Sequence, residues 1–153
     1  MKRFILSALV AIVTLAAHAQ HDYFEKYADM EGVTSVYVSK TMFKFIQGMP
    51  IEVDDVDMEK IINKLDGLYI LTTESPEIKE ALRKETAFIN KKKGYEELMR
   101  VKEDDQKVVV YLKEEKEMRT EYVLVVDSPD DEYVIMVFTG TLKPEDVQGI
   151  INM

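Results

Sequence analysis

The sequence predicts an α+β protein with a single, mainly antiparallel sheet of five to six strands and helices packed on one face. Two observations lead to this fold class. Up to Gly94, short β-type runs alternate with segments whose apolar residues recur at helical spacing. After Gly94, four β-type runs follow one another with only short polar connections, so these strands must be antiparallel neighbours. The expected element order is therefore β-α-α-β-α-β-β-β-β-α.

The start of the chain has the three-part layout of a secretory signal peptide. Lys2 and Arg3 supply positive charge, an apolar run follows, and small residues up to Ala19 occupy the positions that a signal peptidase recognises. The apolar run is shorter than the roughly 18–20 residues that span a bilayer. We therefore expect residues 1–19 to be cleaved and residues 20–153 to form one domain. The mature protein is expected to be periplasmic or extracellular and soluble, without an integral membrane segment.

The domain is expected to begin with a short amphipathic helix and a half-buried strand. The helix is predicted within residues 21–32, where the apolar positions at helical spacing are Tyr23, Phe24, Tyr27 and Met30. Residues 33–39 alternate as a strand does, which turns Val36 and Val38 toward the core. The opposite side of this strand carries Ser35, Tyr37 and Ser39.

From Lys40 the apolar period changes, and residues 40–49 predict a helix capped by Ser39. The stripe expected to face the sheet consists of Met42, Phe45, Ile46 and Met49. Tyr37 and Phe43 fall off this expected core face. We therefore take these two aromatic side chains as the candidate interaction surface.

Two further helices are expected before the sheet continues. Residues 53–67 carry an apolar stripe behind an acidic start, and Gly67 is expected to be a left-handed C-cap. After a strand over residues 68–73, Pro76 opens the longest helix, which Gly94 ends. Because helices connect the first two strands, these two strands could run parallel to each other.

The second half of the domain is expected to be mainly sheet. Its four strands are predicted at residues 98–102, 107–113, 119–127 and 132–139. Between the last two, Pro129 stands where a type I turn favours proline. A final helix is expected from Pro144, with Val147, Ile150 and Ile151 docking inward.

The composition excludes several function classes. The chain contains no cysteine, so it has no thiol nucleophile and no thiolate metal site. Without Lys2 and Arg3, 18 basic residues stand against 29 acidic ones, and this negative balance disfavours nucleic acid as a partner. After cleavage His21 alone remains, so neither a Ser-His-Asp triad nor a histidine zinc site is expected. We expect no cofactor and no enzymatic activity.

Acidic residues gather in four clusters, at residues 54–59, 103–105, 114–117 and 127–132. Each cluster lies at an expected helix start or turn, where dipole and turn preferences favour Asp and Glu. Two alternatives stay open beside this interpretation. Asp127, Asp130 and Asp131 offer clustered oxygens that would suit a calcium ion. Two carboxylates converging in one cleft could serve a carboxylate-dependent hydrolase.

Three stretches of the chain carry a family resemblance, namely "YFEKYADMEGVTSVYVSKTMFKFI", "LDGLYILTTES" and "FTGTLKPEDVQGII". They resemble a family of small exported proteins from Bacteroidetes-type bacteria that is catalogued as domain of unknown function 4252. The resemblance implies a single envelope-exported domain. Genes of such proteins often lie near those of extracytoplasmic sigma and anti-sigma factors, which implies a link to envelope signalling or stress. The resemblance implies no catalytic residues.

The leading functional hypothesis is a non-enzymatic binding or interaction module for an unidentified protein or envelope component. It rests on the expected export, on the lack of a catalytic motif in the sequence and on the family resemblance. The alternative is a small-ligand or calcium-binding protein, and a carboxylate-dependent hydrolase comes third.

Overall fold

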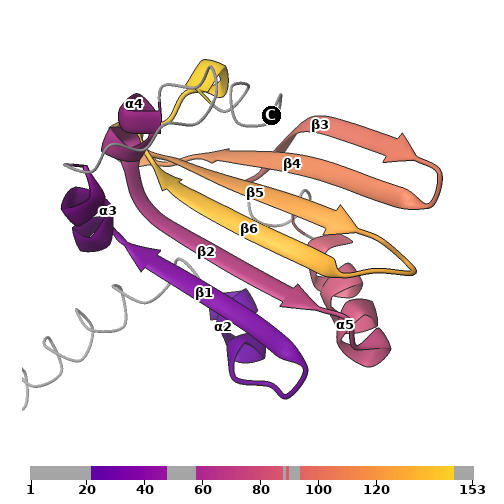
Figure 1. Cartoon of the computed structure of the whole chain (residues 1–153). Helices are drawn as coiled ribbons and strands as arrows, with labels where there is room; N and C mark the ends of the chain where they lie inside the picture. The colour runs from indigo at the N-terminus through magenta and orange to yellow at the C-terminus, as the bar shows by residue number, and fades with distance from the viewer. Residues whose placement is uncertain (1–21, 48–57, 88, 90–93, 147–153) are drawn as a thin grey trace, which may run out of the picture.

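Six strands form one antiparallel sheet in the order β1-β2-β6-β5-β4-β3 (Figure 1). The computed structural model describes residues 22–47, 58–87, 89 and 94–146. The strands are β1 Val33–Ser39, β2 Leu65–Thr73, β3 Glu96–Glu103, β4 Gln106–Glu114, β5 Thr120–Asp127 and β6 Tyr133–Gly140. The α+β class is confirmed, and each expected strand is present close to its predicted bounds. The expected signal peptide and the docking residues of the last helix lie outside the described residues.

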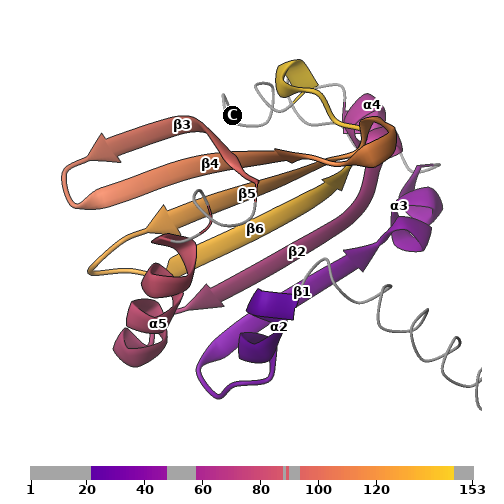
Figure 2. The ribbon, with the colours of Figure 1, turned by 180° about the vertical axis from the view of Figure 1, so that it is seen from behind.

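The helices cover the two faces of the sheet unequally. Their bounds are α2 Asp22–Ala28, α3 Lys40–Ile46, α4 Met58–Lys64 and α5 Pro76–Ala87, with a 3-10 turn η1 at Lys116–Met118. α2 and α5 lie on one face, which we term the covered face (Figure 2). α3 and α4 lie at one end of the sheet (Figure 1). We term the other face the open face, because beyond that end no described helix lies over it.

The first two strands are antiparallel, so the suggestion that they could run parallel is wrong. β1 pairs with β2 from Val33 opposite Thr73 to Ser39 opposite Gly67. A parallel pair needs a crossover that carries the chain back along the whole sheet. α3 and α4 instead stay at the end where β1 finishes and β2 begins (Figure 1), so the chain reverses its direction there.

α3 turns a different side to the core than the sequence predicts. Its cap is confirmed, because Ser39 Oγ accepts a hydrogen bond from the Met42 N–H at 3.3 Å. Phe43, expected on the surface, is 5% exposed and packs in the core, whereas Met42 and Phe45, expected in the core, are exposed. This seven-residue helix follows β1 without a linker, so the end of the strand fixes which side of α3 meets the core. Phe43 is therefore corrected from a surface residue to a core residue.

Gly67 is not a helix cap, contrary to the sequence prediction. α4 ends at Lys64, and Gly67 already belongs to β2, opposite Ser39 on one side and Thr139 on the other. A Cβ at Gly67 would lie 3.0 Å from the Thr139 side-chain oxygen, so the site favours a residue without a side chain. The expected helix end at Gly94 stays a prediction, because α5 is described to Ala87 and residues 90–93 lie outside the described residues. Gly94 itself has a positive φ of 75°, a conformation that glycine adopts without strain.

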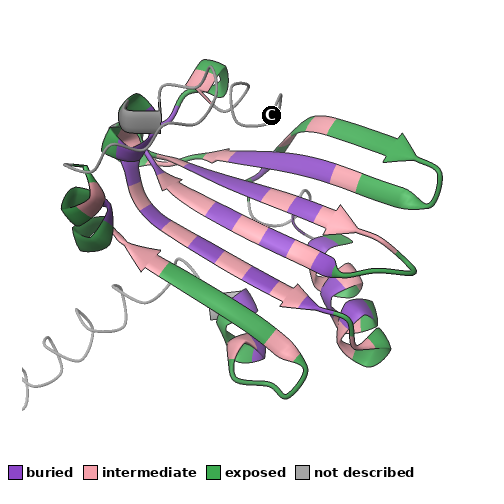
Figure 3. Cartoon of the chain, viewed as in Figure 1, coloured by how far each residue is buried: buried purple, intermediate pink, exposed green. Residues whose placement is uncertain are grey.

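The buried side chains form two clusters, one on each side of the sheet. Burial alternates along β2 and most of β6 (Figure 3). The larger cluster lies between the covered face and helices α2 and α5; it includes Phe24, Tyr27, Leu71, Leu82, Val125 and Ile135. The smaller cluster lies where α3 and α4 meet the open face; it includes Phe43, Ile61, Ile62, Leu112, Tyr122 and Leu142. The rest of the open face holds neither cluster, which leaves its side chains half-buried (Figure 3).

Candidate functional site

β1 forms one edge of the sheet, and within the described residues it pairs with β2 alone (Figure 1). Its seven residues, VTSVYVS, include neither a charge nor a proline, and its register with β2 runs without a bulge. Tyr37, one of the two predicted surface residues, is 64% exposed, and its neighbour Val36 is 45% exposed. An exposed, regular edge strand of this kind presents backbone N–H and C=O groups that another strand can pair with.

Exposed apolar side chains accompany this edge. We define the β1 strip as Met30, Val36, Tyr37, Met42 and Phe45, each at least 45% exposed. They belong to three successive segments of the chain: the α2–β1 turn, β1 itself and α3. Val36 lies on the open face and Tyr37 on the covered face, so exposed apolar side chains border the edge of β1 on both sides. The β1 strip is therefore the first candidate site.

The open face continues the apolar character of β1 across the sheet. Side chains in register on neighbouring strands share a face. One such row runs through Val36, Ile70, Met136, Leu124 and Val110, from β1 to β4. The row contains no charged residue, and its outer end at Val36 is the most exposed. A partner at β1 would therefore meet an uncharged surface that extends into the sheet.

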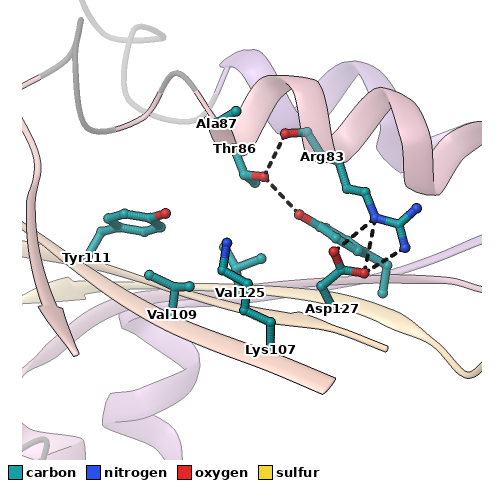
Figure 4. A pocket seen from close by; sticks show the side chains of 9 residues that line it. Arg83, Thr86, Ala87, Lys107, Val109, Tyr111, Val125 and Asp127 are labelled. Atoms are coloured by element: carbon teal, nitrogen blue, oxygen red, sulfur yellow. Dashed lines mark hydrogen bonds and ion pairs between the residues drawn. The ribbon is translucent and has the colours of Figure 1, made fainter. Parts of the chain in front are cut away.

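A pocket of about 230 Å³ under the C-terminal part of α5 is the second candidate site (Figure 4). We term it the α5 pocket. It is lined by Arg83, Thr86, Ala87, Lys107, Val109, Tyr111, Val125, Asp127 and Tyr133. Strands β4, β5 and β6 form its floor, and α5 forms its roof. The pocket therefore lies between chain segments that are far apart in the sequence.

Two polar pairs hold α5 above this pocket (Figure 4). Arg83 donates hydrogen bonds to both oxygens of the Asp127 carboxylate, with Nη2 2.7 Å from Oδ1 and Nε 2.9 Å from Oδ2. These hydrogen bonds raise the pKa of Arg83 above its usual value. Tyr133 Oη lies 2.8 Å from Thr86 Oγ1, and burial raises the pKa of Tyr133 to about 12. Burial also raises the pKa of Tyr111, so both phenols are neutral at ordinary pH.

Cationic side chains of the protein itself bind one of the carboxylates considered for calcium and the backbone of the loop that carries the other two. Asp127 is bound by Arg83, while Asp130 and Asp131 are exposed on the loop between β5 and β6. The buried Lys79 Nζ donates to three backbone carbonyls of this loop: those of Ser128 and Pro129 at 3.4 Å each, and that of Asp131. In the described part of the chain, no group of three or more acidic or histidine side chains is placed to hold a metal ion.

The acidic clusters lie apart where the structure describes them. Residues 103–105 form the β3–β4 turn, and residues 114–117 lie at the other end of β4. The cluster over residues 127–132 belongs to the β5–β6 loop, where Asp127 is neutralised by Arg83. Most of the cluster at 54–59 lies outside the described residues. The converging pair that a carboxylate-dependent hydrolase needs is therefore absent from these three described clusters.

The fold and the two candidate sites define a small α+β protein whose single antiparallel sheet is open on one face and at one edge. Residues 26–150 match the model of the family described as Domain of unknown function (DUF4252), and the chain belongs to this family. Comparison with curated proteins and comparison with solved structures give no match. Among the described residues, no helix has the length and apolar character needed to cross a membrane.

Sequence reasoning identified one member of the β1 strip, Tyr37, as a surface residue. Its expectation that Val36 faces the core is wrong, because Val36 is 45% exposed on the edge strand. It missed Met42 and Phe45, because their spacing also suits a core stripe. Of the residues that line the α5 pocket it named only Asp127, and that as a calcium candidate. Lys107 and Tyr111 look like ordinary strand residues in the sequence, and only the packing of α5 on the sheet brings them to one cavity.

Proposed function

We propose that this protein is an exported, non-enzymatic interaction module that binds an extended segment of a partner protein by strand addition to β1. The observation that carries the proposal is the uncharged, unbulged and exposed edge of β1 together with the β1 strip. Strand addition uses backbone hydrogen bonds for affinity and alternate side chains for specificity. β1 supplies both, because its outer backbone groups and the side chains of Val36 and Tyr37 are accessible.

The chemistry of the edge defines the partner segment. β1 has no charge that could pair with a charged strand, and the formal net charge of −9 repels acidic segments. The exposed members of the strip are aliphatic, aromatic or thioether side chains. The partner segment is therefore an uncharged strand with apolar side chains toward the open face, where Val36 and Ile70 would extend the contact.

Export is part of the proposal and has its own support. The first residues have the layout of a signal peptide, and the family resemblance implies proteins of the bacterial envelope. On this view the partner is an envelope or secreted protein, and the interaction belongs to envelope signalling or stress. Fusion of residues 1–25 to a reporter enzyme that is active only outside the cytoplasm tests this part. An inactive reporter would remove export from the proposal.

The binding step can be tested with a peptide that copies β1. A fluorescent peptide containing VTSVYVS, flanked by solubilising residues, is titrated into the mature chain while fluorescence anisotropy is recorded. Val36→Lys places a charge on the edge and is expected to weaken binding by about tenfold or more, since charged side chains on edge strands oppose pairing. Val101→Lys is the matched control, because Val101 is also 45% exposed on an edge strand, β3.

Hydrogen exchange locates the bound peptide. The amide protons of β1 are expected to become protected when the peptide is added, while those of β3 stay unchanged. If the peptide binds Val36→Lys as well as it binds the wild-type chain, strand addition at β1 is wrong. Equal protection of β3 and β1 would likewise show that the peptide does not distinguish the two edges.

A further inference from the structure

The α5 pocket contains two donor groups without a partner in the described residues. Lys107 Nζ and the Tyr111 hydroxyl both lie on the pocket lining, and Figure 4 shows them directed toward the space beneath α5. Neither side chain makes a hydrogen bond or ion pair with another described residue. Tyr111 as a residue is 7% exposed, but its hydroxyl oxygen is not fully buried, and Lys107 is exposed. A ligand in the pocket can therefore reach both donor groups.

The charges around the pocket add up to an excess of positive charge. Arg83 and Asp127 neutralise each other through their close ion pair. Lys107 remains. Directly opposite it on the same face of the sheet are Asp127 on β5, whose carboxylate is held by Arg83, and Lys102 on β3. Like charges directly across two strands are unfavourable. Both lysines are exposed, and Lys107 lines the pocket, so its ammonium is available to an anionic ligand there.

The floor of the pocket is apolar. Val109 and Val125 lie side by side on β4 and β5 and form this floor together with the ring of Tyr111. A ligand that fills the space must therefore combine an anionic group with a carbon body. The volume of about 230 Å³ limits that body to a small one.

We infer that the α5 pocket binds a small organic carboxylate, with its carboxylate between Lys107 and Tyr111 and its carbon body on Val109 and Val125. The Lys107 ammonium supplies the opposite charge and a charge-assisted hydrogen bond, and the Tyr111 hydroxyl supplies a second donor. Thr86 and Tyr133 satisfy each other, so they close the far wall without competing for the ligand. The inference goes beyond the proposed binding of a partner strand, since the α5 pocket opens on the covered face.

The probe is butyrate, and its neutral isostere butyramide is the reference ligand. Butyrate is titrated into the mature chain while the methyl NMR signals of Val109 and Val125 are followed. We expect saturation with a Kd of about 1 mM or tighter, and binding of butyramide about tenfold weaker or more. Lys107→Gln is expected to weaken butyrate binding by at least about tenfold, because it removes the charge and keeps the length of the side chain. Tyr111→Phe is expected to weaken it by a smaller factor.

Two controls separate this site from surface charge and from the β1 edge. Lys84→Gln removes an exposed lysine of α5 that does not line the pocket, and it is expected to leave butyrate binding unchanged. Val36→Lys is expected to bind butyrate like the wild-type chain, so the two proposals can fail independently. The inference is wrong if butyrate causes no saturable shift of the two valines, or if Lys107→Gln and Lys84→Gln bind it equally.

Discussion

The two edges of the sheet, β1 and β3, differ in charge and in regularity, two properties that govern strand pairing. β1 has no charged residue, whereas β3 has the sequence EELMRVKE, with charges at most positions. β1 pairs with β2 without a bulge, whereas β3 has a register shift between Glu97 and Met99. Glu97 and Arg100 also form an ion pair on β3, with Nη2 2.5 Å from Oε2.

This difference shows that one edge is protected against further pairing and the other is not. Charges and bulges are the usual means by which proteins keep a sheet edge from joining another chain. β3 has both, although it protrudes from the sheet as part of a hairpin. β1 has neither, although it carries exposed apolar side chains. A protein under selection only for solubility would protect both edges, so the bare edge at β1 supports a binding role there.

The largest expected effect comes from making β3 resemble β1. Replacing Glu97, Arg100 and Lys102 by threonine removes the charges that protect β3. A chain with two open edges can associate without limit, whereas a chain with one open edge can form at most a closed pair. We expect the weight-average mass measured by light scattering to rise steadily with the concentration of this variant, and to level off for the wild-type chain.

A control variant removes charges of the same signs elsewhere. Glu80→Gln, Lys84→Gln and Lys116→Gln change exposed residues of α5 and η1. The mass of this variant is expected to follow that of the wild-type chain. If the weight-average mass of both variants rose equally with concentration, net charge rather than the β3 edge would control association.

The next prediction compares β2 and β4, the strands that adjoin the two edge strands. Leu71 lies on β2 beside β1, Val109 lies on β4 beside β3, and both are buried in the larger cluster. Leu71→Ala is expected to lower the free energy of unfolding by about 2–5 kcal/mol, and Val109→Ala by about 2 kcal/mol. Urea unfolding measures both values. A single transition is expected in each case, and a separate early transition in Leu71→Ala would show that the β1 side unfolds on its own.

In the middle of the sheet, Tyr133 on β6 makes the free energy of unfolding depend on pH, an effect that the edge strands do not provide. Unfolded tyrosine ionises near pH 10, whereas burial keeps Tyr133 protonated up to about pH 12. The unfolded state therefore loses a proton first, so the free energy of unfolding is unaffected below pH 10 and falls as pH rises from 10 to 12. A difference of two pKa units corresponds to a loss of about 2–3 kcal/mol.

Chemical unfolding at several alkaline pH values checks this effect, with Tyr133→Phe as the comparison. The variant lacks the ionisable group, so its stability should fall less steeply above pH 10. Some slope should remain, since burial also raises the pKa of Tyr69, Tyr111 and Tyr122. A slope identical to that of the wild-type chain would mean that Tyr133 is not the group responsible.

The smallest effect concerns the junction between β1 and α3. Ser39→Ala removes the side-chain cap of α3 and is expected to cost about 1 kcal/mol of unfolding free energy. Ser35→Ala is the matched change on the same strand, where the Ser35 hydroxyl donates to the Ala28 carbonyl at 3.3 Å on the exposed surface. This second change should cost a few tenths of a kcal/mol. Thermal melting of the two variants side by side measures the difference, and equal costs would contradict the role of the cap.

The sequence predicted the positions of the strands well, because local signals determine them. Residues 33–39 alternate and are followed by a capping serine, and both features depend on immediate neighbours. Strand order and direction were not predictable in this way. β2 pairs with β6 across some sixty residues of sequence, and the direction of β1 depends on where α3 and α4 lie in space.

The candidate sites were less predictable for the same reason. An apolar stripe on a seven-residue helix covers too few turns to indicate which side is buried. The sequence therefore predicted Phe45 in the core and Phe43 on the surface, whereas the structure shows the reverse. Tyr37 is exposed as predicted, but alternation does not explain it. Tyr37 lies opposite Tyr69 of the larger cluster, and Val36, expected to face the core, is 45% exposed because β1 is an edge strand. The α5 pocket requires β4, β5 and α5 in their folded arrangement, so no local pattern around Lys107 could indicate it.

The Lys79 ammonium under the β5–β6 loop has a consequence for the environment in which the protein works. In many extracellular proteins a dissolved metal ion gathers the carbonyls of such a loop, and the loop then depends on the supply of that ion. Here the cation is covalently attached to α5 and cannot be diluted, chelated or exchanged. The folded arrangement of this corner therefore does not depend on the concentration of any dissolved metal ion.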